Sequence, residues 1–210
     1  MSRILVTGGA GYIGTHTCVE LLNAGNEVVV IDNFLNSKKE ALENVKKITG
    51  KNFKFYEMNM NDKDGLDKVF DENDIDAVID FAAYKAVAES VKKPVEYYTN
   101  NVATVLTLLD RMKAHNVKRL VFSSSATVYG DPEVVPITEE SRTGGTTNPY
   151  GTSKLMVEWI LKDLYKSDNT WDIAILRYFN PIGAHESGLI GEEPNGIPAN
   201  LMPYVAKVAS

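Results

Sequence analysis

Short apolar runs alternate with longer amphipathic segments along most of the chain. The apolar runs are rich in β-branched residues, which is typical of buried strands, and the amphipathic segments have the period of helices. The predicted strands are 4–6, 28–31, 53–58, 77–83, 119–123 and 173–178, and the predicted helices are 12–24, 37–49, 62–70, 95–115 and 150–166. This alternation predicts a doubly wound α/β fold, with a parallel sheet of strand order 3-2-1-4-5-6 covered by helices on both faces.

The pattern changes near residue 180. Glycine and proline become frequent between Pro181 and Pro203, and no further strand–helix unit follows. We therefore expect one domain over residues 1–180 and the beginning of a smaller, incomplete domain over 181–210. A last helix is predicted for 201–209, and no stop signal follows it before Ser210, which suggests a piece of a longer protein.

Composition narrows the classes of function. The formal net charge of −6 disfavours a nucleic-acid partner, and the sequence has no apolar stretch of membrane-spanning length. The single cysteine, Cys18, excludes an internal disulfide and fits a reducing cytoplasm. His16, His115 and His185 lack the spacing of metal ligands, so no metal site is predicted.

A glycine-rich turn joins the first strand to the first helix. Gly8, Gly11 and Gly14 have the spacing that lets a backbone approach a pyrophosphate at a helix N-terminus, whereas a tight structural turn is the alternative. Asp32 ends the second strand, 24 residues after Gly8, where a carboxylate binds the adenosine ribose and disfavours the extra phosphate of NADP. We expect a Rossmann NAD site, completed by Asn33, Asn36 and Ser37.

A second group of polar residues suggests catalysis. Tyr150 and Lys154 lie four residues apart and share one face of the predicted helix, where the ammonium would favour the phenolate form of the tyrosine. Ser125 follows the fifth strand, at the edge of the sheet where ligands bind in such folds. Ser123 or Ser124 could take its place, and a solvated helix face and a serine-capped turn are the alternatives without function.

These features together resemble the extended short-chain dehydrogenase/reductase family. Within that family, the resemblance is to enzymes that epimerise C4 of UDP-hexoses, and it runs from Arg3 to the end. It rests on Gly11-Tyr-Ile-Gly, Ile31-Asp-Asn, Lys85-Ala-Val-Ala-Glu-Ser, Ser123-Ser-Ser-Ala-Thr-Val-Tyr-Gly, Leu176-Arg-Tyr-Phe-Asn-Pro and Gly196-Ile-Pro-Ala-Asn-Leu-Met-Pro-Tyr.

The resemblance implies roles for residues that the spacing alone does not reveal. It implies catalysis by Ser125, Tyr150 and Lys154, and contact of Ser125 and Tyr150 with the sugar. The further NAD-binding positions are Tyr12, Ile13, Asn59, Met60, Phe81, Ala82, Ala83, Lys85, Asn100, Ser123, Lys154 and Phe179, and the further positions for the UDP-sugar are Asn180, Asn200 and Leu201. Asn59, where the family usually has Asp, and Ala83 and Ala88, where glycine is commoner, depart from the family pattern.

The implied reaction is transient oxidation of C4 to a ketone, followed by return of the hydride to the other face. Ala126 and Thr127 stand where related dehydratases carry an acid and a base, which favours epimerisation over elimination. A homodimer that pairs the helices predicted for 95–115 and 150–166 is also implied. The alternatives are an NAD-binding module without turnover and an enzyme of this family that acts on another nucleotide sugar.

Overall fold

The computed structural model describes residues 1–193 and 200–209. Two compact units are present: unit 1 comprises Met1–Ala82 with Asn180–Ser210, and unit 2 comprises Ala83–Phe179. The strand order is β3-β2-β1-β4-β5-β6, which confirms the predicted order. The strands are β1 (Arg3–Thr7), β2 (Glu27–Asp32), β3 (Lys54–Glu57), β4 (Ala77–Asp80), β5 (Arg119–Ser125) and β6 (Asp172–Tyr178).

The helices agree with the predicted ones within a few residues. Those of unit 1 are α1 (Tyr12–Asn23), α2 (Lys39–Thr49), α3 (Lys63–Asp71) and α8 (Leu201–Ala209). Those of unit 2 are α4 (Val87–Lys92), α5 (Pro94–Tyr98), the π-helical turn η1 (Thr99–Ala103), α6 (Thr104–Ala114), the 3₁₀ turn η2 (Ala126–Tyr129) and α7 (Pro149–Ser167). No helix in the described ranges has the length and apolar character needed to cross a membrane.

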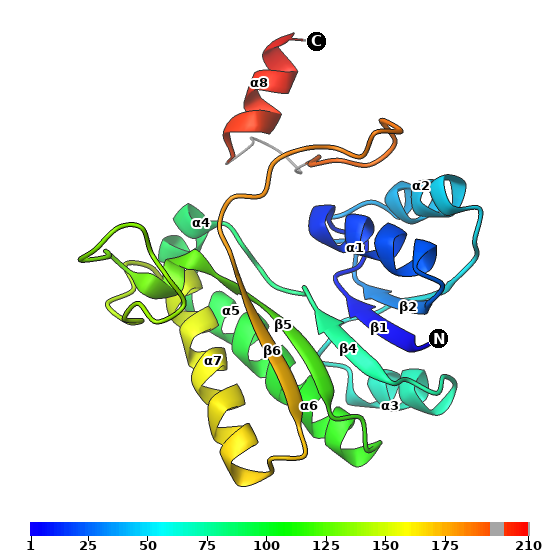
Figure 1. Ribbon diagram of the computed structural model, residues 1–210, viewed down its shortest axis with the longest axis horizontal. Coiled ribbons are helices and arrows are strands. Elements are labelled where there is room, and N and C mark those ends of the chain that lie inside the picture. The colour runs from blue at the N-terminus through cyan, green and yellow to red at the C-terminus, as the bar shows by residue number, and fades with distance from the viewer. Residues whose placement is uncertain (194–199, 210) are drawn as a thin grey trace. The chain divides into compact units, whose positions relative to one another are not determined.

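Unit 1 is built around a parallel sheet in which β2 pairs with β3 and with β1, and β1 pairs with β4. Helices α1 and α2 pack against one another beside β1 and β2 (Figure 1). Their contact encloses an apolar core that includes Val6, Leu22, Val30 and Leu42, none more than 2% exposed. The chain leaves α1 through Gly25, whose φ of +84° suits glycine.

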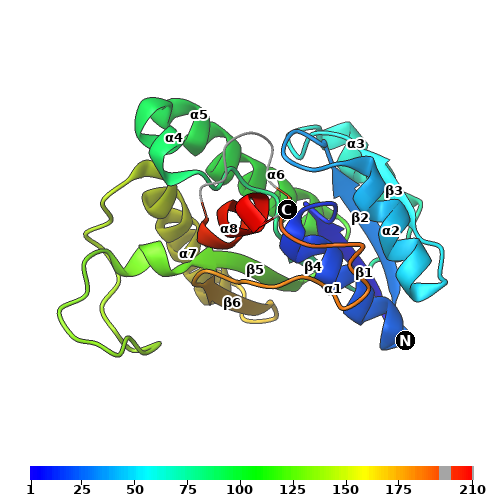
Figure 2. The ribbon, with the colours of Figure 1, turned by 90° about the horizontal axis from the view of Figure 1, so that it is seen from above.

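The segment after residue 180 packs on the same two helices. The hydroxyl of Tyr12 donates to the carbonyl of Gly183 (2.7 Å), and the amide of Asn44 donates to the carbonyl of Leu189 (2.9 Å). Ile190 is buried in the core of unit 1. The segment, drawn in orange, runs beside α1 in the views of Figures 1 and 2. Local packing therefore joins it to the glycine-loop helix.

In unit 2, β5 and β6 form a parallel pair, and α7 packs on both strands as well as on α4, α5 and η1 (Figure 1). The sequence predicts one helix over 95–115, and the structure is helical throughout, but η1 interrupts the α-helical winding. At that turn, the hydroxyl of Thr104 donates to the carbonyl of Asn100.

Three local predictions differ from the structure. The fourth strand ends at Asp80 rather than at Ala83, and β5 continues to Ser125, two residues beyond its predicted end. The serines belong to the strand because Ser124 and Ser125 pair with Arg177 and Tyr178 of β6. The short elements α4 and η2 were not predicted, because neither is long enough to show a helical period.

Candidate functional site

The glycine loop of unit 1 has the geometry of an anion-binding turn. Gly8 has a φ of +64°, and a β-carbon there would lie 2.9 Å from the amide nitrogen of Ala82. A β-carbon on Gly14 would overlap the carbonyl oxygen of Gly8. Gly11 caps α1 without a side chain, and the first-turn amides that follow, including those of Tyr12 and Ile13, have no acceptor within their helix. These amides and the helix dipole can hold a phosphate.

Asp32 has a second role that the sequence did not reveal. Its buried carboxylate accepts from the amide of Ala10 (3.0 Å), from the amide of Phe34 (2.9 Å) and from the hydroxyl of Ser37 (2.8 Å). The first of these bonds fixes the glycine loop, and the other two fix the turn after β2. Ser37 therefore lies beside Asp32, while Asn33 and Asn36 are exposed on the same turn.

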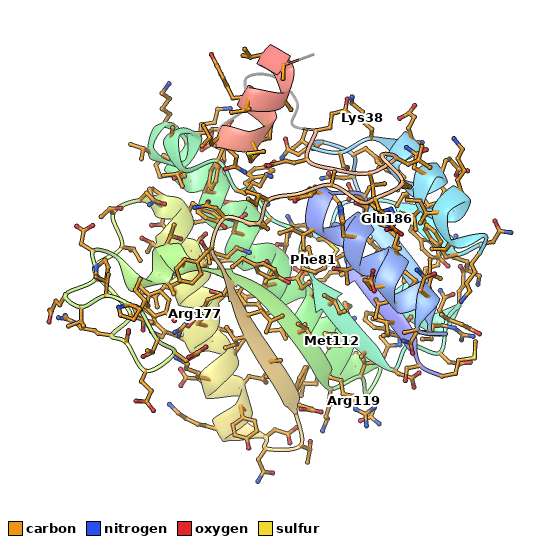
Figure 3. The ribbon with its side chains drawn as sticks, turned by 45° about the horizontal axis from the view of Figure 1, so that its top comes forward. Lys38, Phe81, Met112, Arg119, Arg177 and Glu186 are labelled. Atoms are coloured by element: carbon orange, nitrogen blue, oxygen red, sulfur yellow. The ribbon has the colours of Figure 1, made fainter. Side chains whose placement is uncertain are left out.

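The loop after β4 is held by a buried polar pair. The hydroxyl of Thr7 donates to the carboxylate of Asp80, and the amide of Ala82 donates to the hydroxyl of Thr7 (3.3 Å). These bonds bring Ala82 against Gly8, and the preceding residue, Phe81, is labelled in Figure 3. Phe81 and Ala82 are both predicted cofactor contacts.

The other predicted positions of unit 1 have varied surroundings. Asn59 is exposed and accepts from the amide of Asn61 (3.0 Å), whereas Met60 is buried. Asn180 and Leu201 are exposed, and the amide of Asn200 donates to Glu192. Residues 196–199 of the predicted sugar-binding motif lie outside the described residues.

Unit 2 brings the three predicted catalytic residues together. Ser125 ends β5 and is 7% exposed, and Tyr150 lies in the first turn of α7, which Asn148 caps by accepting from the amide of Gly151 (2.9 Å). The hydroxyl of Ser125 lies near the Tyr150 phenol and acts to lower its pKa. Lys154, one turn further along α7, is 3% exposed.

The strand end distinguishes the three serines that the sequence left as alternatives. Ser125 lies near Tyr150, whereas the hydroxyl of Ser124 donates to Glu158 (2.6 Å). Ser123 contributes its carbonyl oxygen, which accepts from the ammonium of Lys154 (2.7 Å). The same ammonium lies 4.8 Å from the ring centroid of Phe122. The geometry thus favours Ser125 as the serine that assists Tyr150.

The electrostatic balance at Tyr150 differs from the one expected from the spacing to Lys154. Burial raises the pKa of the Tyr150 phenol above its ordinary value, and the nearby hydroxyl of Ser125 partly opposes that rise. Desolvation disfavours the charged form of any acid, so burial works against the phenolate. Spacing alone could not show this, because it gives no measure of how deeply the first turn of α7 is buried.

A buried ionic network that sequence reasoning missed lies one turn beyond Lys154. Glu158 is fully buried and accepts from Nε (3.0 Å) and Nη2 (2.8 Å) of Arg177, in addition to Ser124. Arg177 also donates to the hydroxyl of Tyr129 (2.8 Å). Burial alone would raise the pKa of Glu158, but the hydrogen bonds and charge of its partners bring it below its usual value. Arg177, labelled in Figure 3, thereby links β6 to α7 and to η2.

A second missed network supports the start of α7. Asn101, in η1, is 2% exposed; its amide donates to the carbonyl of Tyr84 (3.0 Å) and to the hydroxyl of Ser153 (3.1 Å). Ser153 in turn donates to the carbonyl of Tyr150 (2.7 Å). The available signal was an asparagine pair inside an apolar helix, which is unusual unless the amide is buried and bonded.

The remaining predicted cofactor positions of unit 2 differ in exposure. Ala83 and Asn100 are partly buried, and the amide of Asn100 donates to Asn101 (3.0 Å). Lys85 is exposed, and Phe179 is 62% exposed. Within residues 1–193 and 200–209, the structure contains no group of three or more His, Cys, Asp or Glu side chains arranged to hold a metal ion.

The sequence and the fold were compared with known proteins. Residues 4–210 match the model of the NAD dependent epimerase/dehydratase family. The UDP-glucose 4-epimerases of Haemophilus influenzae and Bacillus subtilis are 64% and 62% identical over 206 residues, which cover 98% of this chain and 61% and 60% of those proteins. The chain therefore spans about three fifths of the length of these relatives.

Solved structures give the same picture. The structure of UDP-glucose 4-epimerase from Bifidobacterium longum in complex with NAD⁺ and UDP matches with a TM-score of 0.97 at 62% identity, over 99% of this chain and 62% of that one. The enzyme from Stenotrophomonas maltophila with bound NAD and formylated UDP-arabinopyranose matches with a TM-score of 0.96 at 47% identity, over 100% of this chain and 62% of that one.

Proposed function

Because the chain belongs to the NAD dependent epimerase/dehydratase family, we propose that it is part of an enzyme that inverts C4 of a UDP-hexose and interconverts UDP-galactose and UDP-glucose. The observation that carries the proposal is the placement of Ser125, at the end of β5, near Tyr150 of α7, one turn from the buried Lys154. The names of the relatives and the bound UDP compounds of the matched structures support the choice of substrate.

NAD is the proposed cofactor. The first-turn amides of α1 fit its pyrophosphate, and the Asp32 carboxylate fits the hydroxyls of its adenosine ribose, as carboxylates do at the end of a second strand in this fold. A carboxylate at that place would repel the additional phosphate of NADP. The nicotinamide half would engage Lys154, whose ammonium is the nearest cation along α7 to Tyr150. The segment from 181 onward would begin the substrate-binding domain, with Asn180, Asn200 and Leu201 directed to the UDP-sugar.

Bound NAD supplies a hydride acceptor for C4 and returns the same hydride later. The protein residues manage the accompanying proton. Tyr150 takes the proton of the 4-hydroxyl as general base while the C4–H bond breaks and a carbonyl forms at C4. Ser125 hydrogen-bonds the reacting oxygen, and Lys154 favours the ionised tyrosine. After the keto sugar has turned over, Tyr150 returns the proton to the oxygen as hydride reaches the opposite face of C4.

The residues beside Ser125 support epimerisation rather than loss of water. Elimination needs an acid and a base close to the reacting carbons, and here the two positions are Ala126 and Thr127. A methyl group cannot transfer a proton, and the hydroxyl of Thr127 donates to Ser125 (2.9 Å). The sugar would therefore lose and regain only the hydrogen at C4 and the proton of the 4-hydroxyl.

Turnover of UDP-galactose by the full-length protein, followed by NMR, tests the proposal. UDP-glucose should appear without added reductant. Tyr150→Phe should lower the rate by about 10²- to 10⁴-fold, because it removes the general base, while NAD binding persists. Tyr165→Phe is the matched control, since Tyr165 is an exposed tyrosine of the same helix and should leave the rate unchanged. Binding of NAD without conversion of UDP-galactose would contradict the proposed epimerase function.

We further propose a cytoplasmic homodimer that pairs the α5–α6 segment and α7 with their counterparts. These helices carry large apolar side chains that are exposed in the single chain, notably Val95 (71%), Trp159 (53%) and Leu106 (47%). Light scattering on the full-length protein should give the mass of two chains, and Trp159→Glu should shift the mass toward that of one chain. A monomeric wild type at micromolar concentration would contradict the proposal.

A further inference from the structure

Thr127 makes two contacts with the catalytic serine. Its hydroxyl donates to Oγ of Ser125 (2.9 Å), and its backbone amide donates to the same oxygen (3.2 Å). Ser125 is thus the N-cap of the 3₁₀ turn η2, in which Thr127 is the second residue. The bond from the Thr127 amide is enough to make Ser125 the N-cap. The bond from the Thr127 hydroxyl is therefore an additional contact.

The two contacts limit what Ser125 can do next. A hydroxyl group has one proton to donate and two lone pairs that accept. Both lone pairs of Ser125 receive donors from Thr127, so its remaining capacity is to donate. The Tyr150 phenol lies near Ser125, and a hydroxyl that donates to it would favour the ionised tyrosine.

We propose that Thr127 is a positioning residue that keeps the single hydroxyl proton of Ser125 available for donation to Tyr150 or, when substrate is bound, to the reacting oxygen of the sugar. This inference rests on the proposed function. Ser125 is then a fixed donor, and the proton of the sugar hydroxyl passes directly to the oxygen of Tyr150. A relay through Ser125 would require Thr127 to give up one of its two donations.

Thr127 also lies close to Gly151 of α7. A β-carbon built on Gly151, the residue after Tyr150, would lie 3.1 Å from Cβ, Oγ1 and the carbonyl oxygen of Thr127. The first turn of α7 therefore lies directly on Thr127. The same turn carries Tyr150, so the threonine, the serine and the tyrosine are held in one rigid group.

Two other titratable side chains lie near Tyr150. Lys154 lies one turn along α7, and Tyr97 of α5 is close enough for its charge to interact with that of Tyr150. The hydroxyl of Tyr97 is itself bonded to Glu89 (3.0 Å). Substitutions of Thr127 leave Lys154, Tyr97 and Glu89 unchanged. A change in the ionisation of Tyr150 would therefore report on Ser125.

The test compares Thr127→Val, which removes the hydroxyl but keeps the shape, with Thr127→Ser, which keeps the hydroxyl. In the full-length holoprotein, Thr127→Val should lower kcat at neutral pH by about 3- to 10-fold, the value of one hydrogen bond, with KM for UDP-galactose within about 2-fold. The rise of kcat with pH should move upward by roughly 0.5–1 unit. Thr127→Ser should behave as the wild type does.

A second readout does not require turnover. The ultraviolet difference between each protein and the same protein carrying Tyr150→Phe gives the ionisation of Tyr150 alone, and Thr127→Val should move it to higher pH. Thr107→Val is the control, because that hydroxyl donates only to the Ala103 carbonyl of its own helix (3.0 Å). If the wild type lacks turnover, the proposed function fails while this titration still tests Thr127.

An unchanged pH profile and an unchanged Tyr150 titration in folded Thr127→Val would overturn the inference. If Thr127→Val does not fold, Thr127→Ala answers the same question, with thermal unfolding measured alongside. A fall in melting temperature without movement of the titration would assign Thr127 a structural role only, and would also overturn it.

Discussion

The glycine loop of unit 1 and the Ser125–Tyr150 pair of unit 2 reach their geometry by opposite means. The loop requires residues without a side chain, because a β-carbon on Gly8 or Gly14 would clash with neighbouring backbone atoms. The proposed catalytic pair needs polar atoms to be present, because the neighbouring Glu158 and Asn101 are buried and bonded. Unit 1 should therefore be most sensitive to added atoms, and unit 2 to the loss of a charge or an amide.

The largest expected effect on stability lies in unit 2. Glu158→Gln should lower the free energy of unfolding by about 3–5 kcal/mol, because it leaves the guanidinium of Arg177 buried without its carboxylate. Chemical denaturation of the full-length protein measures the change. Glu20→Gln on the exposed face of α1 is the control and should have an effect within about 0.5 kcal/mol. An equally small effect of Glu158→Gln would contradict the structural role of the network.

Unit 1 should respond to a single added methyl group. Gly8→Ala is expected to destabilise the protein by about 1–3 kcal/mol and to weaken NAD binding, because it combines a positive φ with a contact of 2.9 Å to Ala82. Gly25→Ala separates the two causes, since Gly25 also has a positive φ but no neighbour within 4 Å of a β-carbon. Equal losses of NAD affinity in the two variants would contradict the role of the close contact.

The buried carboxylate of Glu158 should also make stability depend on pH. Its pKa is lowered in the folded protein, so the contribution of Glu158 is fully present above the pKa of an unfolded glutamate and is lost as pH falls through the folded value. Acid titration of the wild type and of Glu158→Gln should show two stability curves that converge as pH falls. Parallel curves over the acid range would rule out this linkage.

The smallest effect concerns Cys18. The thiol has no exposed surface, and burial raises its pKa to about 12, so thiolate is scarce at neutral pH. In native protein, a disulfide reagent such as Ellman's should react with it far more slowly than in unfolded protein, and turnover should be unaffected. Fast labelling of the native state would show that the core around α1 opens.

The same contrast explains what the sequence could predict. The strand order and the glycine loop follow from local patterns: apolar runs, a glycine triplet and Asp32 at an expected interval. The buried network was missed because a glutamate on a helix and an arginine on a strand look solvent-exposed in sequence, and only the fold brings Glu158 and Arg177 together. The raised pKa of Tyr150 was missed for a similar reason, since burial is a property of the packed structure.

The choice of the proposed catalytic serine could be predicted only in part. The sequence offered Ser123, Ser124 and Ser125 because a strand end bounded by turn residues has no sharp limit. Strand pairing shows that β5 continues to Ser125, and the contacts then separate the serines. Ser124 donates to Glu158, while Ser125 accepts from Thr127 and lies near Tyr150.

The π-helical turn at Thr99–Ala103 amounts to one surplus residue in the rod formed by α5 and α6. Each residue of an α-helix turns the chain by about 100°, so deletion of one residue here would rotate everything on one side of the turn by about that angle. Tyr97 and Leu108 are both buried, and this rotation would expose one of them. The number of residues in this helical segment, as much as their identity, therefore determines which side chains support the start of α7.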